Sequence, residues 1–254
     1  MKNLMVIFER YLNPDGPRLR IGGVVTRDVA HYHGVPHGSV QVAIVVLKRA
    51  QGKTSPHILL HHRSKWKKTC PETWDVCGGH IDAGERILNN PNVWDDQMLI
   101  KALFAETALR EANEEFRALS NPDFRFTERH LRCFGGLAVF ETGFDDPSAA
   151  NKEHSAFYAA FVPGDIATLE DSDDVKSAFQ VVDSVGVGGA EKEAVALDLK
   201  LVSLPDLVLD FTRAPGDYGD GIARVLSRAA REPGTMKAVV KFLGSYYAET
   251  TAGR

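Results

Sequence analysis

Three carboxylates at helical spacing are the residues of this sequence that are best placed to do chemistry. Glu111, Glu114 and Glu115 occupy positions i, i+3 and i+4 of a strongly helical stretch, so their side chains share one helix face. Like charges at this spacing repel each other, and a divalent cation relieves that repulsion. Hard cations such as Mg²⁺ prefer oxygen ligands and bridge readily to phosphates. The spacing therefore favours a Mg²⁺ site; the alternative is a solvated acidic helix face.

A glycine-rich segment upstream supplies the second half of the pattern. Positions 78–85 read Gly-Gly-His-Ile-Asp-Ala-Gly-Glu, and a glycine backbone can approach a cation or a phosphate closely. The two halves together resemble the Nudix box, which reads Gly, five residues, Glu, seven residues, then Arg-Glu-apolar-x-Glu-Glu-x-Gly-apolar. The matching residues are Gly79, Glu85, Arg110, Glu111, Glu114 and Glu115. The resemblance implies an α+β fold, namely an alpha/beta/alpha sandwich with a mixed β-sheet, and a Mg²⁺-dependent hydrolase that cleaves a diphosphate.

The sequence departs from the family pattern at two places. Between Glu85 and Arg110 lie 110 − 85 − 1 = 24 residues where the family has seven, so we expect an insertion of 17 residues at about 86–102. Arg117 stands where the family has its closing glycine. By resemblance, Arg110 pairs with Glu85 and braces the turn against the helix, and Gly79 contributes a backbone atom near the metal.

A basic loop precedes the glycine turn. Arg63, Lys67 and Lys68 supply the fixed positive charge that a diphosphate needs, although a solvated loop has the same composition. The stretch from His61 to Trp74 resembles the segment before the box in isopentenyl diphosphate isomerases and their nearest Nudix hydrolase relatives. This resemblance implies that Arg63 and the lysines contact the diphosphate, together with the turn residues Gly78, Gly79 and His80.

The same resemblance implies a second metal site. Those isomerases hold a metal with histidines from an N-terminal segment, the histidine of the turn and glutamates before a later strand, and the candidate matches are His31, His37, His80 and Glu153. Glu153 is also a candidate general base for an attacking water. The alternatives are surface or turn histidines and an ordinary loop carboxylate. Asn151 stands where the isomerases carry a first glutamate.

The cysteine that the isomerases use for catalysis has no match in this sequence. When Gly79 and Glu85 are aligned, the cysteine column falls on Gly78, and Cys77 is one position early. One step along a strand turns a side chain to the opposite face. We therefore expect Cys77 to be a buried or idle thiol and favour hydrolysis over isomerisation. A third alternative is a Nudix-like module that binds a nucleotide without turnover, as in a sensor.

Composition limits the remaining possibilities. The chain has 254 residues, of which 44% are hydrophobic and 25% charged, which is typical of a globular protein. A net charge of −4 provides no basic field for a nucleic acid polymer. The three cysteines show no disulfide framework, and no apolar run reaches the length that spans a membrane. We expect a cytoplasmic protein that binds a small-molecule diphosphate with Mg²⁺ (Mn²⁺ is possible), and family resemblance implies a possible homodimer.

The pattern of apolar and turn residues predicts one catalytic domain at 21–212, an N-terminal extension at 1–20 and a C-terminal helical extension at 213–254. Strands are predicted at 40–47, 57–61, 131–141, 156–162 and 194–202. A long helix should begin at Asp95 or Asp96 and end at Asn121-Pro122, and 165–189 reads as a surface excursion. The helix is expected to bury Met98, Ala102, Ala105, Leu109, Ala112 and Phe116, with the glutamates beside this stripe.

Overall fold

The fold is built around one long strand, β3 (His37–Ala50), which is rich in β-branched residues and buried on both faces over most of its length. A computed structural model describes residues 4–13, 16–67, 70–89, 95–134, 139–142, 151–170, 173–187, 190–196, 198–231, 234, 237–238 and 241–242. The other strands are β1 (Leu4–Asn13), β2 (Gly16–Thr26), β4 (Lys53–His62), β5 (Trp74–Asp75), β6 (Cys77–His80), β7 (Phe116–Ala118), β8 (Leu131–Cys133), β9 (Val139–Thr142), β10 (Glu153–Phe161), β11 (Thr168–Glu170), β12 (Phe179–Val187), β13 (Ala190–Val195) and β14 (Leu199–Val202). The helices are α1 (Arg27–His33), α2 (Glu85–Leu88), α3 (Gln97–Glu115), α4 (Val175–Ala178), α5 (Leu204–Arg213), α6 (Asp220–Arg231) and the 3₁₀ turns η2 (Glu128–His130) and η4 (Pro215–Asp217).

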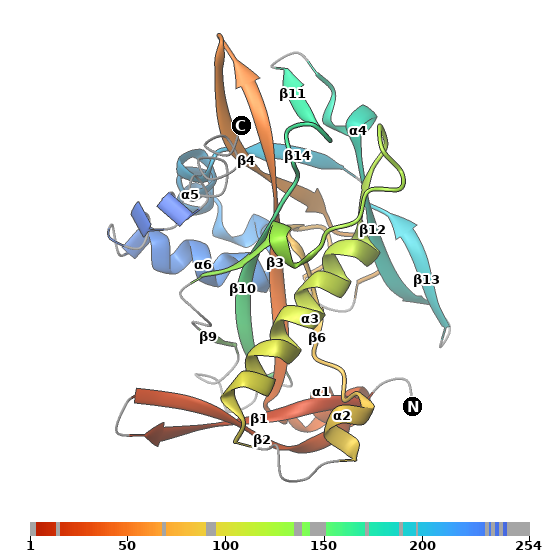
Figure 1. Ribbon diagram of the computed structural model, residues 1–254, viewed down its shortest axis with the longest axis vertical. Coiled ribbons are helices and arrows are strands. Elements are labelled where there is room, and N and C mark those ends of the chain that lie inside the picture. The colour runs from red at the N-terminus through yellow and green to blue at the C-terminus, as the bar shows by residue number, and fades with distance from the viewer. Residues whose placement is uncertain are drawn as a thin grey trace.

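Both edges of β3 are paired, and the sheet is mixed. The antiparallel strands β6 and β4 follow each other along β3, from Ser39–Val42 and from Ile44 onward. The parallel strands β10 and β11 also pair with β3, with Glu153 opposite His37 and Thr168 opposite Leu47. The β1–β2 hairpin joins the sheet at the start of β3 and lies at the bottom of Figure 1. The start of β3 is therefore the point where β1, β6 and β10 come together.

Helices cover the sheet on two sides. The helix α3 packs Phe104, Ala108 and Ala112 onto one face, against Val40, Val42 and other residues of β3. The helices α5 and α6 pack onto the opposite face, over Ala43 and Val45 of the same strand. In Figure 1, α3 crosses in front of β3, and α5 and α6 lie to the left. The predicted α+β class, with helices on both faces of a mixed sheet, is confirmed, and the helices near the C-terminus form one of these two layers.

The long helix α3 begins where the sequence predicts but ends earlier. The Asp96 carboxylate accepts hydrogen bonds from the backbone N–H groups of Met98 (2.9 Å) and Leu99 (3.1 Å) and so caps the helix. The predicted end at Asn121-Pro122 is wrong, because Phe116 is already extended and begins β7, which pairs with β12. The Arg117 guanidinium donates to the carbonyl oxygens of Asn113 and Phe116. Arg117 thus satisfies helix-terminal carbonyls where the family pattern has a glycine.

The predicted buried stripe of α3 is also wrong for most of its members. Met98 is 82% exposed, and Ala102, Ala105 and Leu109 are only partly buried. The residues that α3 buries are Leu99, Ile100, Leu103, Phe104, Thr107, Ala108, Glu111 and Ala112. Consequently Glu111 lies on the buried face of the helix, and the prediction that all three glutamates lie beside the core is corrected for this residue.

Three further expectations differ from the structure. The segment 165–189 is not a surface excursion, because it forms β11, α4 and β12 and buries Leu169, Phe179 and Val181. The predicted strand 194–202 is divided between β13 and β14, and residue 197 between them lies outside the described residues. The strand predicted at 131–141 comprises β8 and β9, and residues 135–138 between them are likewise not described.

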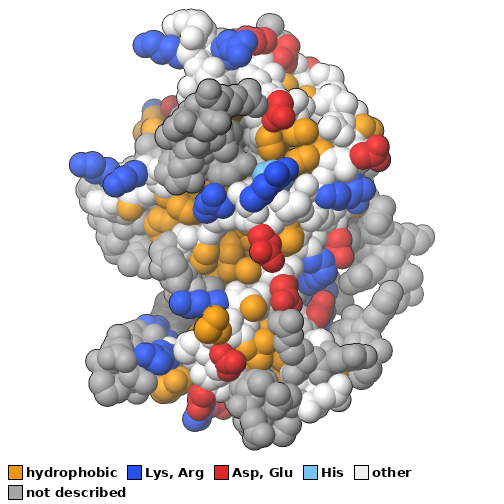
Figure 2. Space-filling model, viewed as in Figure 1, with side chains coloured by type: hydrophobic (Ala, Val, Ile, Leu, Met, Phe, Trp, Pro, Cys, Tyr) orange, Lys and Arg blue, Asp and Glu red, His pale blue; other side chains and the backbone are white. Residues whose placement is uncertain are grey.

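The predicted domain limits fall inside elements. Residue 20 lies within β2 and residue 212 within α5, and the division into a catalytic domain and two extensions stays a prediction. Of the expected insertion, residues 90–94 lie outside the described part of the chain. No helix among the described residues is long and apolar enough to cross a membrane. Acidic and basic side chains are interspersed on the face shown in Figure 2.

Candidate active site

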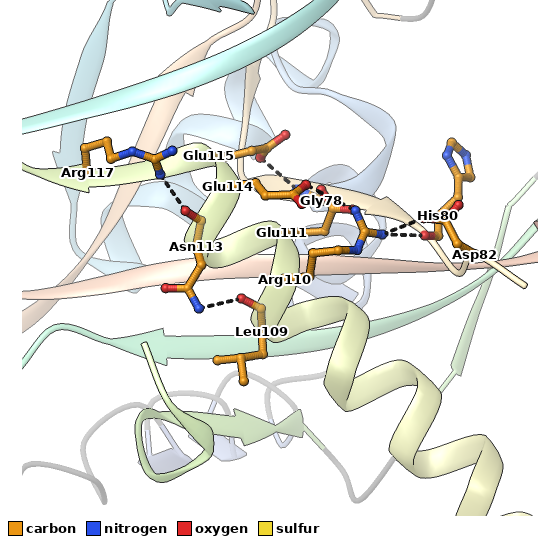
Figure 3. Close-up of polar contacts among 10 residues, drawn as sticks. All are labelled: Gly78, His80, Asp82, Leu109, Arg110, Glu111, Asn113, Glu114, Glu115 and Arg117. Atoms are coloured by element: carbon orange, nitrogen blue, oxygen red, sulfur yellow. Dashed lines mark hydrogen bonds and ion pairs between the residues drawn. The ribbon is translucent and has the colours of Figure 1, made fainter. Parts of the chain in front are cut away.

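The two halves of the split signature meet where α3 passes β6. A Cβ atom at Gly79 would overlap the carboxylate of Glu111, so only a glycine lets this carboxylate lie against the strand. The backbone N–H of Gly78 donates to Glu115 Oε2 at 3.2 Å. Figure 3 shows Glu115 directed toward Gly78 and Glu111 beside it. The glycine turn and the helical carboxylates, 37 residues apart at Gly78 and Glu115, therefore form one site.

Arg110 joins the helix to the turn. Its Nη1 lies 2.8 Å from Glu111 Oε1 and 3.2 Å from Glu114 Oε2. Its Nη2 lies 3.2 Å from Asp82 Oδ2 and donates to the backbone oxygen of His80 at 3.1 Å. One guanidinium thus holds two carboxylates of α3 and two residues of the turn, which is the planar multiple-donor contact that arginine makes and lysine does not.

The predicted partner of Arg110 was Glu85, whose side chain lies outside the described residues. Asp82 occupies this bracing position in the structure and was missed in the sequence. The sequence did offer Asp82 as a candidate partner for Arg110, because this carboxylate lies three residues after Gly79 in the same turn.

Glu111 is the most buried of the three carboxylates. Its side chain is 10% exposed, that of Glu114 is 60% exposed, and Glu115 is partly buried. Burial raises the pKa of Glu111, Arg110 lowers it, and the carboxylates of Glu114 and Asp82 raise it, with a net upward direction. The single positive charge of Arg110 leaves this group of carboxylates with excess negative charge. Such a set of oxygens fits a divalent cation.

Cys77 lies on the α3 side of β6, away from the face that carries His80. It pairs with Val42, is 2% exposed and belongs to the core beneath α3. Burial raises the pKa of the Cys77 thiol well above its usual value, and the adjacent Glu115, to which the thiol hydrogen-bonds, raises it further. The prediction of a buried thiol one step out of register is confirmed. Cys77 nevertheless contacts Glu115 from the core and so helps to position this carboxylate.

Three predicted histidines converge at the start of β3. The ligand atoms of His31, His37 and His80 all lie within 4.8 Å of one another, and their ring centroids are 5.1 Å apart in each pair. His37 Nδ1–H donates to the backbone oxygen of Val35 at 2.8 Å, which leaves the Nε2 lone pair facing the cluster. The Nε2 atoms of His31 and His37 are buried and have no hydrogen-bond partner among the described residues. Orphaned imidazole nitrogens held at this spacing fit a divalent cation.

Burial favours the neutral form of His31 and His37. The pKa of His31 is lowered to about 4, mainly by burial and also by the neighbouring His80 and His37. Burial likewise lowers the pKa of His37. Neutral imidazole is the form that binds metals.

Glu153 borders this cluster. Its Oε1 lies 3.4 Å from His80 Nε2 and 3.9 Å from His37 Nε2. It accepts hydrogen bonds from Ser39 Oγ (2.8 Å) and Asn151 Nδ2 (2.7 Å). Although burial alone raises the pKa of Glu153, these contacts, led by His80, bring it below its usual range. A carboxylate that is stabilised in this way is a weak base and a good ligand or anchor.

His80 links the two groups of residues. Its backbone oxygen faces Arg110, whereas in Figure 3 its imidazole ring points away from the glutamates. That ring meets His31, His37 and Glu153 instead. The box carboxylates and the histidine cluster are therefore on opposite sides of one residue of β6.

One residue of the basic loop has a partner within the protein. Arg63 Nη1 lies 3.0 Å from Asp75 Oδ2; the Asp75 side chain is buried, and that of Arg63 is 17% exposed. Asp75 also accepts from the backbone of Val76 and Ile222, the latter in the first turn of α6. Arg63 thus has a structural partner, and its contact with a diphosphate stays a prediction. Lys67 lies in the turn after β4, and Lys68 lies outside the described residues.

No protein-family model matches the sequence, and no curated protein is found to be similar. A NUDIX hydrolase from Alicyclobacillus acidocaldarius has a TM-score of 0.42 and 15% identity, covering 77% of this chain and 92% of its own. A mutT/nudix family protein from Listeria innocua has a TM-score of 0.39 and 18% identity, covering 75% and 89%. A C. elegans Ap4A hydrolase has a TM-score of 0.33 and 17% identity, and the match covers 76% of this chain and 95% of that hydrolase. The chain is similar to solved structures that carry the Nudix and MutT family names.

Proposed function

We propose that this chain is a Nudix-type hydrolase that cleaves the diphosphate bond of a nucleoside diphosphate derivative or a related small-molecule diphosphate. The observation that carries the proposal is the contact of Glu111 and Glu115 with Gly79 and Gly78. Two sequence segments that resemble the halves of one motif, with 24 residues between Glu85 and Arg110, pack together in space. A solvated acidic helix face would have no reason to bury Glu111 against a glycine.

Mg²⁺, or Mn²⁺ in its place, fits the carboxylates of Glu111, Glu114 and Glu115. When bound there, it would supply positive charge next to the phosphoryl oxygens and so stabilise the charge that develops as the bond breaks. Arg110 keeps the carboxylates aligned with the turn. Gly79 leaves the space in which Glu111 lies against β6.

The proton of the attacking water needs an acceptor. Glu153 is poorly suited, because its contacts lower its pKa. The box carboxylates are the remaining candidates, since they lie beside the proposed cation. We therefore assign proton acceptance to the box carboxylates and assign Glu153 to holding His80 and the start of β10.

A second candidate function is an isomerase of the isopentenyl diphosphate kind. The histidine cluster beside Glu153 favours it, because that resemblance implied His31, His37 and His80 as metal ligands. The position of Cys77 counts against it. Protonation of a double bond needs an acid at a defined place, and the Cys77 thiol lies on the opposite face of β6 from the His80 ring.

The proposal is tested by phosphate-coupled turnover against a panel of nucleoside and prenyl diphosphate compounds, with Mg²⁺, with Mn²⁺ and with EDTA. The expected result is metal-dependent cleavage of one class of compound; a nucleoside diphosphate derivative gives two phosphate monoesters, from which an added phosphatase releases the phosphate that is measured. No release from any compound, together with conversion of isopentenyl diphosphate that is lost in a Cys77→Ala variant, would replace the hydrolase with the isomerase. If the protein binds a nucleotide but shows neither hydrolysis nor isomerisation, the remaining alternative is a sensor module that binds without turnover.

A further inference from the structure

The face of the sheet that packs under α5 and α6 changes from apolar to polar at the same pair of residues on the neighbouring strands β3 and β10. Residues two apart along a strand share a face, so Ala43 and Val45, which pack under α5 and α6, share theirs with Gln41 and Ser39 of β3. The parallel strand β10 carries Phe157 opposite Gln41. The next pairs toward the start of both strands are Ser39 with Ser155 and His37 with Glu153. The apolar part of the face thus ends at Gln41, and the polar part leads to the histidine cluster.

Two glycines make room for the Gln41 side chain. Gly78 of β6 pairs with Gln41, and a Cβ atom at Gly78 would lie 2.8 Å from Gln41 Oε1. A Cβ atom at Gly221, in the first turn of α6, would overlap the same amide group. The amide of Gln41 therefore lies between β6 and the start of α6, where both elements have a glycine.

The Gln41 amide is half-buried and polar. The structure shows no hydrogen bond from its side chain to any other described residue. A polar group that is partly removed from water without a protein partner is costly unless a ligand or water binds it. An amide offers one acceptor and two donors, so it can pair with a planar group that presents both.

Gly78 also connects Gln41 to the box. Its backbone N–H donates to Glu115 Oε2 at 3.2 Å, while its Cα lies beside Gln41. A single residue thus separates the amide from a carboxylate of the proposed cation site.

We propose that Gln41 is a specificity-determining residue that hydrogen-bonds to the group attached to the diphosphate. It selects a group with both donors and acceptors, such as a nucleobase edge, over a hydrocarbon chain. This inference rests on the proposed diphosphate hydrolase. Discrimination arises because a substituent without hydrogen-bonding groups would leave the amide unpaired in the closed complex.

The test compares Gln41→Met, which keeps the shape and removes the amide, with Gln41→Glu, which removes the donors. We expect kcat/KM for a nucleoside diphosphate sugar to fall about 10- to 100-fold in the Met variant, while kcat/KM for a simple alkyl diphosphate changes less than about twofold. Gln180→Met, on the distant strand β12, is the matched control and should change neither value. An equal loss on both substrates, or no loss on the nucleotide, would overturn the assignment.

A binding measurement separates this inference from the hydrolase proposal. If the wild-type protein turns over neither substrate, the proposed function fails, and calorimetric titration with ADP in Ca²⁺ decides the role of Gln41. Weaker ADP binding by Gln41→Met than by the wild-type chain, at equal melting temperatures, supports the assignment. Equal affinities, or no ADP binding by the wild-type chain, refute it.

Discussion

Glu111 shows how a single position ties the chemistry of the site to its packing. Its carboxylate lies against Gly79, contacts Arg110 and faces the core side of α3. Burying a charge is costly unless a partner compensates for it, and one shared guanidinium is a small compensation for Glu111 and Glu114 together. A bound cation should compensate for the remaining negative charge and so reduce the cost of burying Glu111.

A methyl group at Gly79 should displace Glu111. We expect Gly79→Ala to lower turnover and to reduce the free energy of unfolding by about 1–3 kcal/mol, as overpacked sites do. The matched control is Gly84→Ala in the same turn, because a Cβ atom at Gly84 meets nothing within 4 Å. Urea unfolding and phosphate release measure the two effects. Equal behaviour of both variants would contradict the close contact between Gly79 and Glu111.

Neutralising Glu115 should separate catalysis from folding. We expect Glu115→Gln to reduce kcat by about 10³-fold, because it removes a ligand charge from the proposed cation site. The melting temperature should stay close to that of the wild-type protein, since Gly78 N–H can still donate to the amide oxygen. Glu106→Gln, on the exposed side of the same helix, is the control. Near-normal turnover in Glu115→Gln would remove this residue from the mechanism.

At the level of elements, α3 shows what the sequence could and could not predict. The Asp96 cap and the i, i+3, i+4 spacing of the glutamates are local features, and both were predicted correctly. The buried face of α3 was not predicted correctly, because Leu99 and Leu103 have the same four-residue spacing as Met98 and Ala102, one position along the chain. Period alone does not choose between two apolar faces. The choice is made by tertiary packing against β3.

The histidine cluster illustrates the same limit at longer range. Family resemblance singled out His31, His37, His80 and Glu153, and the structure brings all four together. Nothing in their spacing along the chain requires this. The parallel pairing of β10 with β3 brings in Glu153, and the antiparallel pairing of β6 with β3 brings in His80; both are properties of the sheet. Ser39 was missed, although a polar residue inside an otherwise apolar strand was a visible signal.

The ion pair between Arg63 and Asp75 fastens α6 to the sheet. Asp75 accepts from Arg63 and from the backbone of Ile222. Removing Arg63 would leave a buried carboxylate without its charged partner, so we expect Arg63→Met to reduce the free energy of unfolding by about 3–5 kcal/mol. The double variant Arg63→Met/Asp75→Leu should recover part of this loss. A residue that served only to bind diphosphate would instead raise KM and leave urea unfolding unchanged.

For the molecule as a whole, the buried histidines predict how stability depends on pH. The folded-state pKa of His31, about 4, lies below the unfolded value of about 6.5. As the pH falls between these values, the unfolded chain binds a proton that the folded chain does not, and stability is lost. His37 acts in the same direction, and Glu153 does so only at lower pH, where its carboxylate becomes protonated. Glu111, whose pKa is raised, acts in the opposite direction.

The measurement is urea unfolding in EDTA at pH 7, 6 and 5. We expect the free energy of unfolding to fall with pH less steeply in His31→Gln than in the wild-type protein. Parallel curves for the two proteins would show that His31 is accessible to protons in the folded state.

The parallel ladder between β3 and β10 has a kinetic consequence. Ser39 and Glu153 are 114 residues apart in the chain, yet they share a hydrogen bond at the centre of the site. Pairing so distant must wait until a long loop has closed, and such pairings form slowly. The hairpin of β1 with β2 and the helix α3 are local and can form early. The histidine cluster is therefore completed late, and until β10 has docked, the unpaired edge of β3 can form hydrogen bonds with other strands.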